Sequence, residues 1–171
     1  MIAFHGNQQN ISIARSNWKY IENYNYQVEY IQSKILDSYN LFRWEDEENT
    51  EVHKVLKEIP WNLYEEKILS GFSSGCNEIF KLLLEKSTLA DKIILISPWI
   101  PIIDSKLDNI LNIINDNNIN VQIICGKEDK DCYPFVKLIK SKVYGNKNFD
   151  INIIERLKHE FPENIEKLVI V

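Results

Sequence analysis

The sequence predicts an α/β fold, a three-layer αβα sandwich around a mostly or wholly parallel six-stranded sheet. Two segments, Ile93–Ile96 and Val121–Cys125, are apolar almost throughout, which is typical of strands covered by helices on both faces. Segments with apolar residues at helical spacing, such as Ile79, Leu82 and Leu83, lie between the strand-like runs. A strand followed by a helix recurs about six times, and right-handed crossovers of this kind produce a parallel sheet.

Six strands are expected, and they are Ile2–Phe4, Gln27–Ile31, Lys67–Gly71, Lys92–Ser97, Asn120–Cys125 and Asp150–Glu155. Helices are expected after the third, fourth and fifth strands, over Cys76–Lys86, around Leu107–Ile114 and over Tyr133–Val143. No repeat, linker or low-complexity segment interrupts this pattern. We therefore expect a single domain that spans residues 1–171.

The segment Asp37–Thr50 departs from the pattern. It carries Trp44 and the acidic run Glu45–Glu48, and a helix is expected to begin at Glu51. The acidic side chains either lie at the N-terminus of that helix, where the helix dipole favours negative charge, or form a loop that faces the substrate.

The composition is that of a soluble globular protein, with 171 residues of which 44% are hydrophobic and 26% are charged. A net charge of -5 disfavours nucleic acid or an anionic membrane as a partner. No window approaches the roughly 18 consecutive apolar residues of a membrane-spanning helix, and we expect no secretory signal. The three cysteines, Cys76, Cys125 and Cys132, form no C-x-x-C pair. Neither a disulfide framework nor a structural zinc site is therefore expected, and a cytoplasmic location fits best.

The segment Gly71–Gly75 reads Gly-Phe-Ser-Ser-Gly and lies between a predicted strand and a predicted helix. This context is typical of a nucleophile elbow, in which a turn holds the central serine, Ser73, in a strained backbone conformation. The two glycines leave room where the strand and the helix crowd each other. The first N–H groups of the helix then point toward the group that the serine attacks. The alternative is a tight strand–helix turn with a capping serine.

With this elbow the chain resembles the α/β-hydrolase family, and the segment Ile2–Asn10 extends the resemblance. It contains an apolar strand followed by His5 and a glycine, which is similar to the loop that supplies half of the family's oxyanion hole. The resemblance implies that the N–H groups of Asn7 and Ser74 together bind the oxyanion. We expect His5 to be a structural residue under the loop rather than a catalytic one.

Two more segments are similar to the family in the expected order. Gly126–Asp129 follows the fifth strand and resembles the family's acid turn, which implies that Asp129 orients the histidine. Asp131 is the alternative acid, because a small difference in the path of the loop would bring its carboxylate to the histidine in place of that of Asp129. If neither carboxylate binds the histidine, each fits a solvated turn or a helix cap. His159 lies after the last strand and before a Phe-Pro pair, and it resembles the family's general base. The implied triad has the order Ser, Asp, His.

The resemblance covers only the core of the fold. It implies an α/β-hydrolase core that lacks the two N-terminal strands of the usual fold, with its six strands in the order 2-1-3-4-5-6. The strand Gln27–Ile31 is then an exposed edge that a helix, a loop or another subunit, as in a homodimer, must cover. The loop after the fourth strand is too short to fold as a cap domain. Its residues Trp99, Ile100 and Ile102 either line an acyl or leaving-group pocket or pack as core.

These features imply a serine hydrolase that cleaves a carboxylic ester or thioester through an acyl-enzyme. No metal and no organic cofactor are implied. An open cleft suits a small-molecule ester or an acyl group presented on a carrier. The alternatives are a peptide- or C–C-bond hydrolase with the same triad and a non-catalytic binding scaffold.

Overall fold

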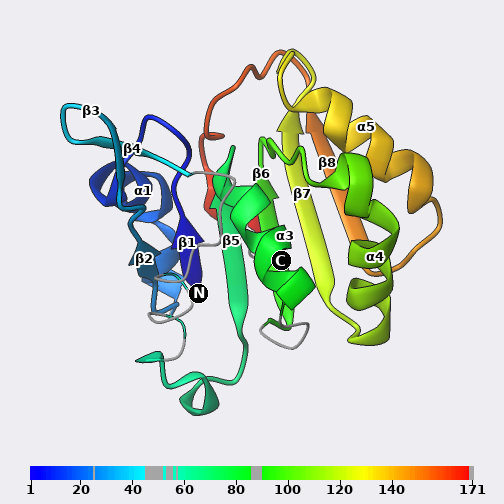
Figure 1. The fold of residues 1–171 in the computed structure, drawn as a ribbon, viewed down its shortest axis with the longest axis horizontal. Helices are drawn as coiled ribbons and strands as arrows, with labels where there is room; N and C mark the ends of the chain where they lie inside the picture. The colour runs from blue at the N-terminus through cyan, green and yellow to red at the C-terminus, as the bar shows by residue number, and fades with distance from the viewer. Residues whose placement is uncertain (25, 45–51, 53–55, 57, 86–89, 170–171) are drawn as a thin grey trace.

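A six-stranded sheet forms the centre of the computed structural model, which describes residues 1–24, 26–44, 52, 56, 58–85 and 90–169 (Figure 1). Its neighbouring strands are all parallel, and their order is β2-β1-β5-β6-β7-β8. The strands are β1 (Ile2–Phe4), β2 (Glu29–Ile31), β5 (Ile68–Phe72), β6 (Lys92–Ile96), β7 (Asn120–Gly126) and β8 (Phe149–Ile154). The predicted parallel sheet and its strand order are confirmed.

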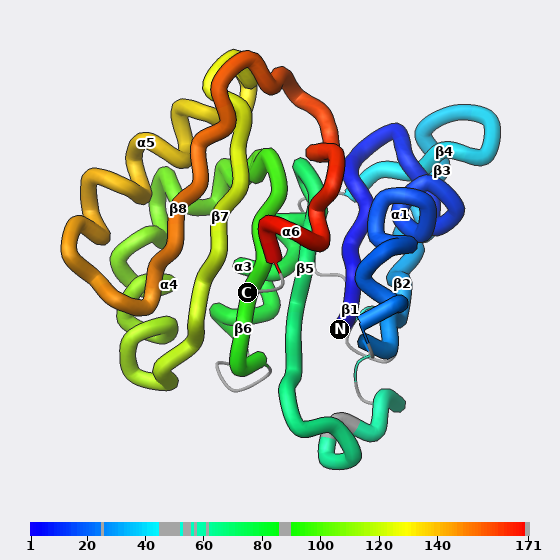
Figure 2. The backbone as a smooth tube through the Cα atoms, turned by 180° about the vertical axis from the view of Figure 1, so that it is seen from behind, coloured from blue at the N-terminus to red at the C-terminus, as the bar shows by residue number. Residues whose placement is uncertain are grey.

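Helices cover both faces of the sheet, as Figures 1 and 2 show from opposite sides. The helices are α1 (Ile11–Trp18), α3 (Gly75–Glu85), α4 (Ile103–Asp116), α5 (Tyr133–Lys142) and α6 (Ile165–Val169), with short 3-10 turns at Ile21–Tyr24 and Trp61–Leu63. Helices α3, α4 and α5 lie on one face, and α1 and α6 lie on the other. Within the described ranges no helix is long and apolar enough to cross a lipid bilayer.

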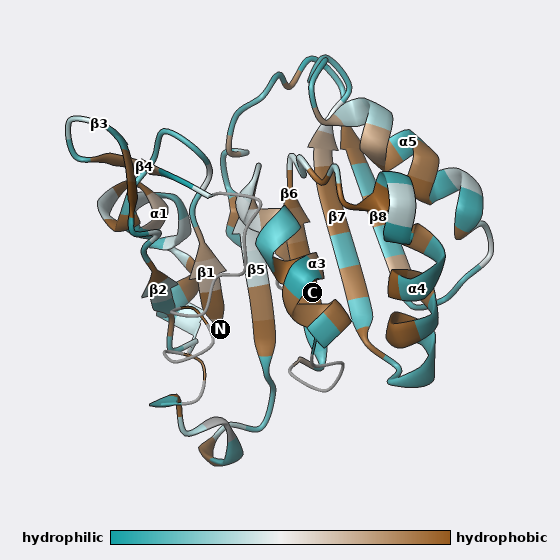
Figure 3. Ribbon diagram, in the orientation of Figure 1, coloured by the Kyte–Doolittle hydropathy of each residue, from teal (hydrophilic) through white to brown (hydrophobic). Residues whose placement is uncertain are grey.

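The side chains of β6 illustrate why the core has two halves. Ile93 and Leu95 are fully buried in the cluster that contains the inner faces of α3, α4 and α5, whereas Ile94 and Ile96 are fully buried in the cluster that contains residues of α1 and α6. Figure 3 shows β6 as hydrophobic along most of its length, while α4 alternates between hydrophilic and hydrophobic bands. Each fully buried aliphatic side chain contributes about 1.5–3 kcal/mol, so burial on both faces accounts for the continuous apolar run.

An antiparallel hairpin of β3 (Ile35–Ser38) and β4 (Leu41–Arg43) lies beside the loop that follows β1. Phe42 connects the two, because its N–H donates to the carbonyl of Gln9 over 2.8 Å. The sequence analysis did not predict these strands. The hairpin side chains are exposed or half-buried, so no alternation of apolar and polar residues marks them.

The segment after this hairpin is described only in part. The acidic run Glu45–Glu48 and the expected helix start at Glu51 lie outside the described residues. Val52 and Leu56 are helical and buried, in the region where the sequence predicts a helix.

Candidate active site

The turn between β5 and α3 places Ser73 at the carboxyl end of the sheet. Ser73 has a φ of +53°, a left-handed conformation that is uncommon for residues other than glycine. Main-chain hydrogen bonds hold it there: its N–H donates to the carbonyl of Ile96 over 3.0 Å, and its carbonyl accepts from the N–H groups of Cys76 over 3.0 Å and Trp99 over 3.2 Å. Such backbone strain costs about 1–3 kcal/mol and persists where the surrounding structure fixes it.

Two glycines allow the close approaches that this turn requires. A Cβ atom on Gly71 would lie 2.8 Å from the backbone nitrogen of Cys76, and one on Gly75 would lie 2.6 Å from the carbonyl oxygen of His5. Both distances are shorter than van der Waals contact. The glycines therefore let α3 begin directly against β5 and let the loop after β1 pass over the first turn of α3.

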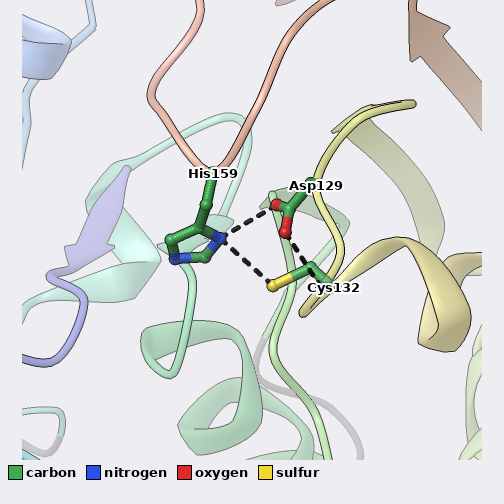
Figure 4. A group of neighbouring side chains, drawn as sticks. All are labelled: Asp129, Cys132 and His159. Atoms are coloured by element: carbon green, nitrogen blue, oxygen red, sulfur yellow. Dashed lines mark hydrogen bonds and ion pairs between the residues drawn. The ribbon is translucent and has the colours of Figure 1, made fainter.

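Three side chains from three loops meet at this edge of the sheet. The Nε2 atom of His159 lies 3.0 Å from the hydroxyl oxygen of Ser73. Its Nδ1 atom lies 2.9 Å from Oδ2 of Asp129, as Figure 4 shows. The carboxylate can only accept, so Nδ1 carries the proton and Nε2 faces the serine hydroxyl as an acceptor. This is the hydrogen-bond arrangement that a serine requires to lose its proton to an imidazole.

Main-chain donors fix the buried carboxylate of Asp129. Its side chain is fully buried, and Oδ1 accepts from the N–H groups of Asp131 over 3.2 Å and Cys132 over 3.0 Å. The backbone therefore orients one carboxylate oxygen while the other meets His159. Of the two acids that the sequence left open, Asp129 contacts the histidine, and Asp131 points into the cleft described below.

Aromatic rings hold the loop that carries His159. The ring of Phe72 lies 5.3 Å from the imidazole, and the ring of Phe161 lies 5.9 Å from Phe72 and 5.1 Å from Trp18 of α1. These rings anchor the loop after β8 to β5 and α1. The sequence analysis noted the Phe-Pro pair after His159 but not the packing partners of Phe161, since no sequence spacing indicates them.

Cys132 is a further neighbour of the histidine that the sequence analysis missed. Its Sγ atom lies 3.4 Å from Nδ1 of His159, and its side chain is fully buried (Figure 4). Burial, reinforced by the nearby charge of Asp129, raises the pKa of the Cys132 thiol, which therefore stays protonated and neutral at neutral pH.

Asp129, Cys132 and His159 also form a candidate set of metal ligands. Among the described residues, Asp129, Cys132 and His159 are the one group of three whose ligand atoms lie within 4.8 Å of one another. Metal binding would need the thiolate form of Cys132 and a deprotonated Nδ1 on His159. The raised thiol pKa and the hydrogen bond from Nδ1 to the carboxylate both favour the metal-free arrangement.

The loop after β1 reaches the residue that follows Ser73. The N–H of Asn7 donates to the hydroxyl oxygen of Ser74 over 2.7 Å. The sequence predicted that the N–H groups of Asn7 and Ser74 would lie together, but not that the Ser74 hydroxyl would accept the first of them. The side chain of Asn7 is also fixed, because its Oδ1 accepts from the N–H of Trp44 over 2.8 Å.

His5 supports this loop from below. Its side chain is fully buried and stacks on Trp44 at 4.8 Å, and Trp44 Nε1 donates to the carbonyl of His5 over 2.7 Å. Nδ1 donates to the carbonyl of Gly6 over 2.7 Å, while Nε2 accepts from the N–H of Ser33 over 3.0 Å. Burial lowers the pKa of His5, so the neutral form is favoured. His5 contacts neither Ser73 nor the cleft within the described residues, as expected for a structural histidine.

A cleft of about 340 Å³ opens beside Ser73 and His159. Besides these two and the pair Asn7 and Ser74, it is lined by Trp99, Asp131 and Phe135. In the loop after β6, Trp99 is 37% exposed and lines this cleft, and the expectation that Ile100 lines a pocket is corrected. Ile100 is fully buried and packs in the core with the residues of α3 and α4, and Ile102 packs against the same cluster.

Comparison with known proteins identifies the fold. No protein-family model and no curated protein sequence matches the chain. An uncharacterized protein from Bacillus cereus ATCC 10987 is 28% identical with a TM-score of 0.86, and the match covers 98% of this chain and 56% of the Bacillus protein. This chain therefore spans little more than half the length of that protein.

Two enzymes of known class also match over 98% of this chain. A carboxylesterase from Mesorhizobium loti has a TM-score of 0.69 at 16% identity, with 85% of its own chain covered. The monoacylglycerol lipase from Paleococcus ferrophilus has a TM-score of 0.65 at 12% identity, with 90% covered. Because the strand order, the elbow and the two loops beyond it all occur within this shared region, the chain has the α/β-hydrolase fold.

Proposed function

We propose that the chain is a serine hydrolase that cleaves a carboxylic ester or thioester through an acyl-enzyme. The observation that carries this proposal is the pair of hydrogen bonds made by His159, one of 3.0 Å to Ser73 and one of 2.9 Å to the buried Asp129. The fold is shared with a carboxylesterase and a monoacylglycerol lipase, which supports the same class of reaction.

The first half of the reaction is acylation. Nε2 of His159 takes the hydroxyl proton of Ser73 as the serine oxygen attacks the carbonyl carbon. Asp129 holds the imidazole in the tautomer that can accept this proton and stabilises the imidazolium that forms. The imidazolium then protonates the leaving alcohol or thiol as the tetrahedral intermediate collapses.

The tetrahedral oxygen needs hydrogen-bond donors, and two elements provide them. The N–H of Ser74 lies at the start of α3, where the helix dipole adds a favourable field. The loop after β1 brings the N–H of Asn7 to the Ser74 hydroxyl, and this N–H leaves that acceptor when it binds the oxyanion. Removal of one such donor costs about 3–4 kcal/mol in a serine hydrolase.

The second half of the reaction is deacylation. A water molecule enters the open cleft, His159 removes its proton, and the resulting hydroxide attacks the acyl carbonyl. The hydroxyl of Ser73 regains its proton and the carboxylic acid leaves. The half-exposed His159, with 36% of its side chain accessible, allows this water to approach.

A panel of p-nitrophenyl esters, thioesters and aminoacyl amides tests the proposal. Turnover of esters or thioesters, with a rapid first turnover from acylation, is the expected result for the purified protein. The Ser73→Ala variant should lack both phases while keeping the circular dichroism spectrum of the parent. Turnover confined to the amides would favour a peptide-bond hydrolase, and no turnover in any class would favour the binding scaffold.

A further inference from the structure

Asp131 places a carboxylate in the cleft beside the proposed nucleophile. Its side chain is exposed and lines the same cleft as Ser73 and His159. Within the described part of the chain, no Lys or Arg forms an ion pair with it, and no Lys or Arg lines the cleft. Lys130 precedes it in sequence but is not among the lining residues. Among the described residues, the lining of the cleft therefore holds one carboxylate and no ammonium or guanidinium group.

The main chain of Asp131 is fixed relative to Asp129 and His159. The N–H of Asp131 donates over 3.2 Å to Oδ1 of Asp129, the carboxylate whose other oxygen meets His159. Asp131 is therefore tied by one hydrogen bond to the residue that orients the imidazole. The side chain of Asp131 therefore starts from a fixed point of the loop and enters the cleft that holds Ser73 and His159.

Two aromatic side chains share the cleft with this carboxylate. Trp99 is 37% exposed, and its main-chain N–H donates over 3.2 Å to the carbonyl of Ser73, which fixes the backbone of Trp99 beside the nucleophile. Phe135 is half-buried in the first turn of α5, one turn after the loop that carries Asp131. Aromatic faces together with a carboxylate form a binding site for an organic cation, because the ring quadrupole and the negative charge attract the same ligand.

We propose that this cleft selects esters that carry an alkylammonium group close to the ester bond. The ammonium group contacts Asp131 and the rings of Trp99 and Phe135 while the carbonyl lies at Ser73. The inference rests on the proposed function, since it names the substrate class of the same site. An anionic ester meets the carboxylate and is disfavoured by like-charge repulsion.

Matched substrate pairs test this selectivity on either side of the ester. The first pair is acetylthiocholine and its uncharged isostere, in which carbon replaces the quaternary nitrogen of the thiol part. The second pair is a p-nitrophenyl ester of a trimethylammonio-alkanoic acid and its carbon isostere, which places the charge on the acyl part. We expect kcat/KM to favour the cationic member of at least one pair by about tenfold at low salt, and the preference to shrink as salt is added.

The Asp131→Asn variant assigns the preference to this side chain. The ratio of kcat/KM for the cationic and neutral members should fall about tenfold toward unity, and Trp99→Leu should lower it by a smaller factor. Glu128→Gln is the matched control, because Glu128 is an exposed carboxylate of the same turn that does not line the cleft, and it should leave the ratio as it is.

The outcomes separate this inference from the proposed function. Equal turnover of charged and uncharged esters, or a preference that Asp131→Asn leaves intact, overturns the inference while the hydrolase assignment stands. The latter result would leave Asp131 with a role confined to the N-terminus of α5. Absence of turnover for every ester would overturn the proposed function itself.

Discussion

The main-chain N–H of Asn7 donates a 2.7 Å hydrogen bond to the Ser74 hydroxyl, which joins the loop after β1 to the residue that follows Ser73. The two residues are 67 positions apart in the sequence. This bond holds the loop that carries Asn7 against the start of α3, and the Asn7 N–H must exchange the Ser74 hydroxyl for the oxyanion during the reaction. The Ser74 side chain is therefore expected to act on catalysis through the placement of Asn7.

Replacement of Ser74 tests that relationship. Ser74→Ala removes the acceptor and loosens the loop, so we expect kcat to fall about tenfold with little change in KM. Ser74→Thr retains a hydroxyl and should recover part of the loss. Steady-state kinetics with one good ester measure both. An alanine variant as active as the parent would show that the Ser74 hydroxyl accepts the Asn7 N–H without contributing to catalysis.

The acid of the proposed triad can be assigned by two separate substitutions. Asp129→Asn keeps the shape of the side chain but favours the wrong histidine tautomer, and kcat should fall by roughly 10⁴-fold. Asp131→Asn should lower kcat far less on an uncharged ester, because the imidazole contacts the carboxylate of Asp129 and not that of Asp131. A larger fall in kcat from Asp131→Asn than from Asp129→Asn would reverse the assignment.

Protonation of His5 should destabilise the fold. The neutral ring accepts the Ser33 N–H at Nε2, and burial lowers the pKa of His5 below its ordinary value of 6.5. The unfolded chain therefore binds this proton more readily than the folded protein does. Stability is fully present above about pH 6.5 and is lost as the pH falls through the folded pKa, by at most about 1.4 kcal/mol per pH unit.

Chemical denaturation between pH 5 and pH 8 measures this effect. His5→Gln keeps an acceptor that does not titrate, so the free energy of unfolding of this variant should vary less with pH over the acidic half of the range. An identical pH dependence in the parent and the variant would exclude His5 as the source.

The three cysteines should react slowly with thiol reagents in the folded protein. All of them are buried, and burial raises their pKa values, that of Cys125 to about 12. The reactive form is the thiolate, which is scarce at neutral pH under these conditions. Ellman's reagent should report three thiols promptly only after unfolding. Rapid reaction of Cys132 in the native protein, with loss of activity, would contradict the neutral-thiol description.

The sequence predicted the sheet because its central strands are buried on both faces. Continuous runs such as Ile93–Ile96 have few alternative interpretations, and the elbow around Ser73 follows the neighbouring strand β5 directly. The β3–β4 hairpin escaped prediction because its side chains are largely exposed and carry no periodic signal. Burial patterns therefore determine how much of the fold can be read from this sequence.

Contacts between loops could not be predicted in the same way. Asp129 and Asp131 lie in one turn, and only the backbone path decides which carboxylate meets His159. Likewise, Trp99 lines the cleft while the next residue, Ile100, is buried in the core, because the path of the loop turns the two side chains in different directions. The contact of Cys132 with the imidazole depends on packing between α5 and the loop after β8, which no local pattern records.

The most direct test of the central claim is covalent labelling of the intact protein with a fluorophosphonate, read by peptide mass spectrometry. An activated serine should form one adduct on the peptide that carries Ser73, and both Ser73→Ala and His159→Ala should abolish or strongly slow it. An unlabelled parent protein, or an adduct at another serine, would contradict the assignment of Ser73 as a nucleophile activated by His159.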